Sequence, residues 1–230
     1  MQVAGRLPTT AMETTVPPEQ HDMMIATTNP GKLAEIRVEL EALGVRAIGL
    51  ADLPDRPVTP EETGTTFLEN ALIKARSYAS QTGRRCLADD SGLVVDALDG
   101  APGVISSHYA TSGVETGVVR ADRDKANNEA LLAALGEVPE GERTARFVCI
   151  MVVVGPDGEV IAKGDGAFEG RIGIPPVVPR GGSGFGYDPL FLIGRSVDRT
   201  SAELTPEEKN ALSHRGIALR AVISQLRGSA

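Results

Sequence analysis

A long apolar run that ends at a turn limits the possible folds of this chain. Residues 147–154 read FVCIMVVV and consist mostly of branched apolar side chains, which is typical of a buried β-strand. The sequence GPDG follows at residues 155–158 and is typical of a tight turn. We therefore expect residues 159–163 to return as the second strand of a hairpin, and residues 168–172 to extend the same sheet.

The folded part of the chain is expected to begin near Asp22, with a strand that leads into a helix. Residues 23–27 are a short strand candidate, and Asn29-Pro30 suits the N-cap and the first position of a helix. Gly44 is a typical helix terminator. Between these ends, apolar residues recur at helical spacing, at Leu33, Ile36, Leu40 and Leu43. A strand, a loop and a helix in this order are typical of the start of an α/β domain.

Further helices and strands alternate along the chain. Thr66 and Glu69 have the spacing of a capping box, so we expect a helix over residues 66–82. Other helices are expected over residues 122–135, after Thr205 and from about Ser213. The apolar segments 84–88 and 93–98 are strand candidates, and the polar sequence DDSG between them is expected to be a turn. Irregular loops are expected over residues 99–121 and, rich in Gly and Pro, over residues 173–189.

No internal repeat, heptad pattern or linker divides residues 22–228. The fold class we predict is therefore α/β: one domain over residues 22–230, with a mixed β-sheet flanked by helices and two lobes around a central cleft. Residues 1–21 contain Pro8, Pro17 and Pro18 and lack an apolar core pattern, so we expect a disordered tail without a signal peptide.

Charge and cysteine content narrow the classes of function. The net charge of −8 disfavours binding to DNA or RNA, whereas a nucleotide remains a suitable ligand if local bases and a metal ion meet its phosphates. Cys86 and Cys149 lie in apolar runs and are expected to be buried thiols. No apolar stretch reaches the ~18 residues of a membrane span. We expect a soluble, cytoplasmic protein whose partner is a small molecule, with no membrane or nucleic-acid partner.

The first motif with chemical meaning is TTNPGK, which joins the first strand to the first helix. A helix N-terminus offers free N–H groups and a positive dipole end, which suits phosphate, and Lys32 adds a full positive charge there. An ordinary capped helix with an exposed lysine would give the same local pattern. The candidate phosphate-binding residues are Thr27, Thr28, Asn29, Pro30, Gly31 and Lys32.

The second motif is acidic. Asp89 and Asp90 are adjacent carboxylates that repel each other unless a cation or a donor compensates. Glu61 and Glu62 precede the 66–82 helix, and carboxylates from separate segments are a usual way to hold Mg²⁺. Such a carboxylate can also accept a proton from an attacking water. Ser91 could donate to a ligand from the expected turn. A solvated acidic turn is the alternative.

The third motif is GGSGFGYDP at residues 181–189. Its glycines allow close approach to the backbone, and Phe185 lies among them instead of in a core pattern, so its ring could stack on a base. A flexible hairpin loop is the alternative. The fourth motif contains Lys209, His214 and Arg215, which are donors able to read keto oxygens on a purine edge. On the local pattern alone, a surface helix cap is the favoured alternative for the His214-Arg215 pair.

Taken in order, these segments resemble one family. TTNPGK, EETGTTFLENALIKA, ADDSGLVVDAL, GSGFGYDP and LTPEEKNALSHRG look like the motifs of the inosine/xanthosine triphosphate pyrophosphatases, over nearly the whole chain from Met23 to Leu226. The resemblance implies an elongated mixed sheet with a cleft between two lobes, a homodimer and Mg²⁺ as cofactor. One departure is His108, where many relatives carry Arg, so the contribution of that Arg is in doubt here.

The resemblance also implies roles for individual residues. Asp90 matches the catalytic proton acceptor and metal ligand, with Glu62 and its neighbour Glu61 beside the metal. The substrate contacts that it implies are the 27–32 loop with Lys32 on the triphosphate, Ser91, Phe185, Gly186, Tyr187, Asp188, Lys209, His214 and Arg215.

The sequence therefore predicts an enzyme that hydrolyses dITP, ITP and XTP to the monophosphate and pyrophosphate. One alternative is a pyrophosphatase for other non-standard or pyrimidine nucleotides, and another is a nucleotide-binding regulator without turnover. The acidic motif disfavours the regulator, because a binder of polyanions gains nothing from carboxylates unless a metal intervenes.

Overall fold

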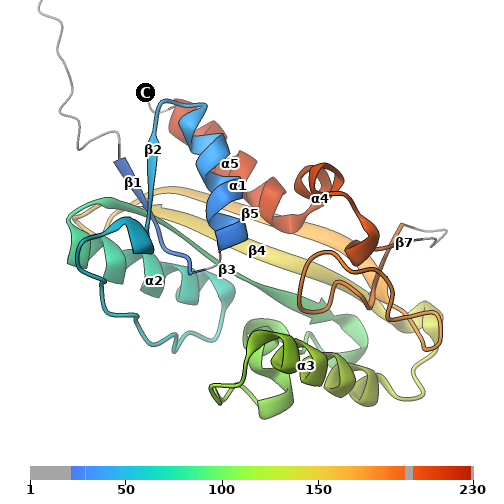
Figure 1. Cartoon of the computed structure of the whole chain (residues 1–230). Helices are drawn as coiled ribbons and strands as arrows, with labels where there is room; N and C mark the ends of the chain where they lie inside the picture. The colour runs from blue at the N-terminus through green and yellow to red at the C-terminus, as the bar shows by residue number, and fades with distance from the viewer. Residues whose placement is uncertain (1–21, 29, 195–198, 229–230) are drawn as a thin grey trace, which may run out of the picture.

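The computed structural model describes residues 22–28, 30–194 and 199–228, and within them one mixed sheet is covered by helices on both faces (Figure 1). Seven strands follow the order β2-β1-β3-β4-β5-β6-β7. β1 pairs in parallel with β2 and β3, and the remaining pairs are antiparallel. The strands are β1 (Asp22–Ile25), β2 (Arg46–Gly49), β3 (Arg85–Val95), β4 (Thr144–Val154), β5 (Val160–Ile172), β6 (Phe191–Ile193) and β7 (Arg199–Thr200).

The helices divide between the two faces of this sheet. α1 and α5 cover one face, whereas α2 covers the other (Figure 1). The α-helices of the described residues are α1 (Pro30–Glu41), α2 (Phe67–Thr82), α3 (Arg120–Leu135), α4 (Pro206–Leu212) and α5 (His214–Gly228). α3 packs with the 3-10 helix η4 (Gly103–Thr111). None of the described helices is long and apolar enough to cross a membrane.

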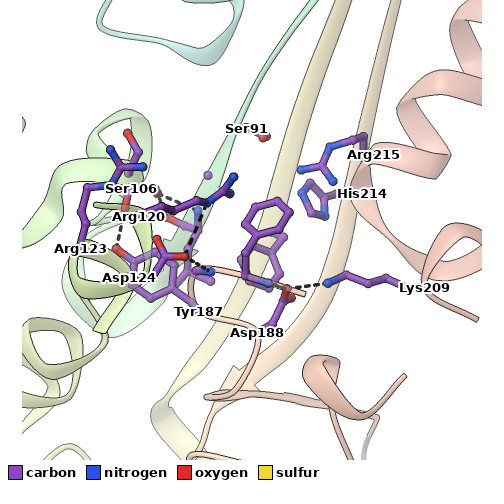
Figure 2. A pocket seen from close by; sticks show the side chains of 16 residues that line it. Ser91, Ser106, Arg120, Arg123, Asp124, Tyr187, Asp188, Lys209, His214 and Arg215 are labelled. Atoms are coloured by element: carbon purple, nitrogen blue, oxygen red, sulfur yellow. Dashed lines mark hydrogen bonds and ion pairs between the residues drawn. The ribbon is translucent and has the colours of Figure 1, made fainter. Parts of the chain in front are cut away.

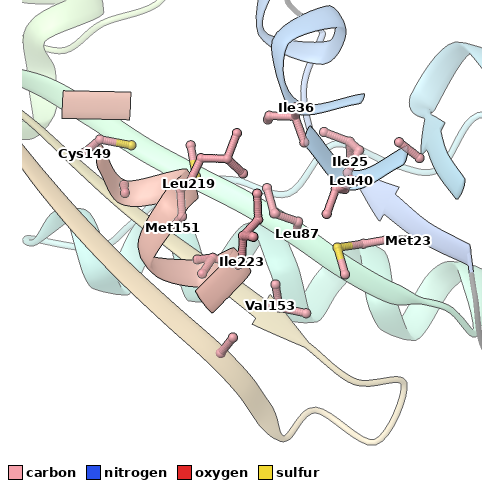
Figure 3. Close-up of a cluster of buried hydrophobic side chains, with 14 residues drawn as sticks. Met23, Ile25, Ile36, Leu40, Leu87, Cys149, Met151, Val153, Leu219 and Ile223 are labelled. Atoms are coloured by element: carbon pink, nitrogen blue, oxygen red, sulfur yellow. The ribbon is translucent and has the colours of Figure 1, made fainter. Parts of the chain in front are cut away.

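Apolar side chains at alternate positions of the strands build the core on each face. Leu87 and Met151 point to the side of α1 and α5, where they meet Ile36, Leu40 and Leu219 (Figure 3). Cys86, Ala88 and Val152 belong to the opposite core beneath α2. Cys86 and Cys149 are buried free thiols, as predicted, and burial raises the pKa of Cys86 to about 12.

The predicted turn at DDSG is wrong, because β3 runs unbroken through these residues. Asp89 lies opposite Met151 and Asp90 opposite Ile150 in the ladder with β4. The local turn preference is overridden because β4 offers a long apolar partner whose backbone pairs with β3 along almost its whole length. Successive side chains of a strand point to opposite faces, so Asp89 faces α1 and α5 whereas Asp90 faces α2.

Most other elements agree with the sequence predictions. α2 has the expected capping box, in which the Thr66 hydroxyl oxygen accepts from the Glu69 N–H at 3.2 Å. The β4–β5 hairpin is confirmed, but its second strand begins at Val160 and continues through residues 168–172 as one strand. The expected loop over residues 99–121 contains η4, and the short strand β2 was not predicted. Asn29 and the expected tail over residues 1–21 lie outside the described residues.

Two glycines of β5 allow α5 to lie very close to the sheet. A Cβ atom at Gly166 would collide with the backbone oxygen of His214, and one at Gly164 with that of Ala218. Any larger residue at either position would push the helix away from the strand. These glycines therefore fix the start of α5, where His214 and Arg215 lie.

Candidate active site

The first part of the site is a buried ion pair between α1 and β3. Asp89 is only 4% exposed, and its Oδ2 lies 2.6 Å from the Lys32 Nζ. Burial alone would raise the pKa of Asp89, but the positive charges of Lys32 and Arg215 hold it well below its ordinary value. The structure thus brings together the lysine of the first motif and an acid of the second.

On the other face of β3, Asp90 meets the side chains of α2. Its carboxylate is 3.3 Å from the Lys74 Nζ and accepts a hydrogen bond from the Asn70 Nδ2 at 3.3 Å. Lys74 also pairs with the Glu62 Oε2 at 2.9 Å. Burial raises the pKa of Asp90, with Lys74 opposing this rise and Glu62 adding to it. One ammonium group therefore holds two carboxylates from separate segments.

This geometry distinguishes the two glutamates that precede α2. Both glutamates are exposed, and Glu62 is the one whose carboxylate pairs with Lys74 and so lies within the Asp90 cluster. Within the described residues, no group of three or more His, Cys, Asp or Glu side chains is arranged to hold a metal ion. Glu62 and Asp90 are therefore the carboxylates that the structure places together.

The second part of the site is a pocket of about 110 Å³ between α3 and the start of α5 (Figure 2). Ser91 and Gly92 of β3 line it, so the pocket begins one residue beyond Asp90. Lys32 and Asp90 themselves do not line it. Its other lining residues are Leu93, Ser106, Ser107, Arg120, Arg123, Asp124, Phe147, Phe185, Gly186, Tyr187, Asp188, Lys209, His214 and Arg215.

Side-chain contacts of a buried aspartate connect the loop over residues 181–189 to its neighbours. Asp188 is buried and accepts hydrogen bonds from the Phe185 N–H and the Ser201 hydroxyl, both at 2.8 Å. It also pairs with the Lys209 Nζ at 2.5 Å. Gly184 has a φ of +81° and no room for a Cβ beside Asp188 and Lys209. These contacts present the Phe185 ring to the pocket.

Tyr187 anchors the same loop to the opposite wall of the pocket. Its hydroxyl donates to the backbone oxygen of Ser106 at 2.8 Å, and burial raises the pKa of Tyr187 above its ordinary value. Lys209 and Tyr187 therefore fix the loop from two sides, through Asp188 and Ser106.

His214 and Arg215 are buried, so the interpretation of this pair as a surface cap is wrong. The His214 ring stacks on Phe147, with ring centroids 5.2 Å apart. Burial, followed by the charge of Arg215, lowers the pKa of His214 well below its usual value, so the ring is neutral. The His214 Nδ1 and the Arg215 Nε are buried, and neither has a hydrogen-bond partner in the described part of the chain.

Arg215 connects the two parts of the site. Its Nε is 3.9 Å from the Asp89 Oδ2, and its guanidinium carbon is 5.6 Å from the centre of the Phe185 ring. A molecule that occupies both the pocket and the surroundings of Asp89 must pass this side chain. The arrangement suits a ligand with a flat group at one end and negative charge at the other.

The described residues of the 27–32 motif lie outside the pocket lining. The Thr27 N–H donates to the Ile25 oxygen at 2.9 Å, whereas Thr28 and Pro30 are exposed. Gly31 lies in the first turn of α1, and Lys32 is the member of this motif that contacts Asp89.

Comparison with known proteins places these features in one family. A model of the Ham1 family matches residues 23–225, which is nearly the whole chain. The chain belongs to the Ham1 family. The dITP/XTP pyrophosphatase of an Exiguobacterium species is 48% identical over 204 residues, which cover 89% of this chain and 96% of the relative. The enzyme of the same name from Mycobacteroides abscessus is 46% identical over 207 residues, with coverages of 89% and 94%.

Solved Ham1 structures confirm the mixed-sheet fold. The Ham1 protein of Staphylococcus aureus is 37% identical and superposes with a TM-score of 0.76, covering 91% of this chain and 100% of its own. The Ham1 protein of Coxiella burnetii is 39% identical with the same TM-score, and the coverages are 90% and 98%. The resemblance that the sequence motifs indicated is therefore confirmed.

Sequence reasoning missed part of this Ham1 site. Lys74 and Asn70 were not candidates, although they lie four residues apart on α2 and both face Asp90. Their spacing on a helix directly after the glutamate pair was a usable signal. Arg120, Arg123 and Asp124 of α3 could not be found in this way, because only the tertiary fold brings this helix to the 181–189 loop.

His108, the departure noted in the sequence, lies behind the pocket wall. Its Nε2 is 2.7 Å from the Glu115 Oε2 and 3.1 Å from the Arg123 Nη1. Arg123 and Ser107 line the pocket, but His108 does not. His108 therefore contacts the site through Arg123 and through the Ser107 hydroxyl, which is 2.8 Å from its Nδ1.

Proposed function

We propose that this chain hydrolyses the non-canonical purine nucleoside triphosphates dITP, ITP and XTP, releasing the monophosphate and pyrophosphate. Membership of the Ham1 family and the close relatives named dITP/XTP pyrophosphatase make it a nucleoside-triphosphate pyrophosphatase. The observation that carries the proposal is the position of Arg215 between the Asp89–Lys32 pair and the Phe185 ring. A nucleotide has the matching layout, with a flat base at one end and phosphates at the other.

The chemistry is proposed to take place beside β3. Asp90 accepts the proton of a water that attacks the α-phosphorus, and Lys74 and Asn70 hold its carboxylate in place. Lys32 balances the charge of the phosphates and of the departing pyrophosphate, assisted by the N–H groups at the start of α1. No residue becomes covalently attached in this scheme.

Mg²⁺ is the cofactor that these residues fit. Mg²⁺ binds hard oxygen ligands and is commonly held by one or two carboxylates together with substrate phosphates and waters. Glu62 and Asp90 supply two carboxylates through their shared contact with Lys74. When bound there, the ion would neutralise phosphate charge and polarise the phosphoryl oxygens. Glu61, which is exposed, is a secondary candidate from the sequence.

Selection of the base is proposed to depend on buried donors. The Arg215 guanidinium would donate to the 6-keto oxygen of hypoxanthine or xanthine, with the neutral His214 ring beside it. Adenine carries an amino group at that position, so donors would face donors at a buried site. The base itself would stack on Phe185, and Ser91, Lys209 and the 185–188 segment would surround the nucleoside.

A panel of nucleoside triphosphates assayed with Mg²⁺ for pyrophosphate release tests this proposal. We expect rapid release from dITP, ITP and XTP, and kcat/KM values lower by at least about 100-fold for ATP. A preference for pyrimidine nucleotides would mean that the enzyme acts on a different class of substrate. Binding of ITP without pyrophosphate formation would support a regulator instead.

The sequence resemblance implies a homodimer. Size-exclusion chromatography with light scattering measures the molar mass in solution and tests this expectation.

A further inference from the structure

Arg120 lies across the pocket from His214 and Arg215 (Figure 2). It is the first residue of α3, and its guanidinium carbon is 4.2 Å from the centre of the Phe185 ring. Lys209 and Arg215 lie farther from the same ring centre, at 5.7 Å and 5.6 Å. Arg120 is thus the cation in closest contact with this ring, at a distance typical of a stacked guanidinium.

Contacts between α3 and the loop place the start of this helix beside the Phe185 ring. Residues 120, 124 and 128 are spaced by four and lie on one face of α3, and each contacts the loop segment that carries the ring. The Asp124 Oδ2 accepts from the Gly186 N–H at 2.9 Å, and the Asn128 Nδ2 donates to the Gly186 oxygen at 3.1 Å. Asp124 also lies 3.7 Å from the Arg120 Nε. This face of α3 therefore brings Arg120 next to the segment that carries Phe185.

We propose that Arg120 determines base affinity by forming a second stacking surface, so that the purine is held between its guanidinium and the Phe185 ring. This inference rests on the proposed function, which supplies the base. Arginine guanidinium planes and aromatic rings are the two side-chain surfaces on which nucleobases commonly stack. A lysine at the same position would keep the charge but would lack the flat surface.

The geometry permits the base to enter. A base between two flat layers requires about 7 Å between them, so Arg120 must swing outward by about 3 Å. The Arg120 side chain is 47% exposed, and its ion pair with Asp124 is long, so the side chain can move without breaking a buried contact. Stacking of a base on a phenyl ring is stronger than an exposed cation–π contact, so the base displaces the guanidinium from the ring.

Binding of paired ligands to Arg120→Ala, Arg120→Lys and wild type tests the proposal. IMP contains a base, whereas ribose 5-phosphate carries the same phosphate without one. We expect Arg120→Ala to weaken IMP binding by roughly fivefold to tenfold and to change ribose 5-phosphate binding by less than about twofold. Arg120→Lys should lose most of the IMP affinity as well. Lys125→Ala, on the exposed side of the same helix, is the matched control for charge and should leave both affinities unchanged.

Hydrolysis of ITP gives a second readout. Arg120→Ala should raise KM severalfold, with kcat within about twofold of the wild type, because the contact lies far from the scissile bond. If Arg120→Ala loses affinity equally for IMP and ribose 5-phosphate, Arg120 acts only through its charge. If Arg120→Ala binds IMP more tightly than the wild type, Arg120 blocks access to the Phe185 ring. Either result overturns the stacking proposal. Absence of pyrophosphatase activity in the wild type would instead refute the proposed function.

Discussion

At the residue scale, the two adjacent aspartates differ because strand geometry sends them to opposite faces. Asp89 is buried against Lys32 and held ionised, whereas Asp90 lies beside Lys74 with its pKa raised by burial. A group that must accept a proton requires a pKa near the working pH. A carboxylate that pairs with a lysine instead requires a low pKa, so that it stays ionised. This difference agrees with the proposal that Asp90 is the base, and we infer that Asp89 positions Lys32.

Replacement of Asp90 by Asn tests this division of roles. We expect kcat for ITP to fall by about 10²- to 10⁴-fold, because the proton acceptor is lost. Thermal unfolding should stay close to that of the wild type, since Lys74 retains Glu62 as a partner. Asp165→Asn removes an exposed aspartate of β5 and serves as the control, with unchanged turnover. Turnover of Asp90→Asn at the wild-type rate would exclude this residue as the base.

His214 gives a prediction for stability against pH. Its folded-state pKa lies well below the unfolded value of about 6.5, so below pH 6.5 the unfolded chain binds a proton that the folded chain excludes. Stability should therefore fall as the pH drops from 7 to 5, and His214→Asn should remove up to about 1.4 kcal/mol per pH unit of that slope. Denaturant unfolding at several pH values measures how the unfolding free energy changes with pH. Equal slopes for the wild type and His214→Asn would contradict the buried neutral ring.

At the element scale, the fold is predictable from the sequence wherever a signal is local. The α2 capping box and the apolar run of β4 both appear in the structure as predicted. The DDSG segment does not, because its turn-forming residues are paired with an apolar neighbour that lies about 60 positions later. For the same reason Arg120 was not predicted, since its partner in the 181–189 loop is distant in sequence.

The close contact between β5 and α5 is an element-scale feature that can be tested. Gly166→Ala places a methyl group against the His214 backbone, so we expect a loss of about 3 kcal/mol in unfolding free energy. The start of α5 should also shift, which would raise KM for ITP. Gly141→Ala adds the same methyl group where no atom lies within 4 Å and should be neutral. Chemical denaturation measures the unfolding free energy of both variants. If the Gly166→Ala value equals that of the wild type, α5 can move away from β5 without cost.

At the scale of the whole molecule, the pocket joins segments from both halves of the sequence. β3, η4 and α3 supply one wall, and the 181–189 loop with α4 and α5 supplies the other. The walls already touch through Tyr187 and Ser106 and through Gly186 and Asp124. The protein is acidic overall, yet the pocket is lined by Arg120, Arg123, Lys209 and Arg215, so the attraction for a nucleotide is local.

Hydrogen exchange can show whether a nucleotide couples the two walls. IMP at about 100 times its Kd should slow exchange by up to roughly 100-fold at amides that exchange through opening of the pocket. We expect this protection at the start of α3, in residues 183–188 and at the start of α5 together, because the base contacts all three. Pyrophosphate has no base, so it should protect α1 and β3 near Lys32 and leave α3 unchanged. Protection by IMP on one wall alone would mean that the base binds to a single surface and that the pocket does not close around it.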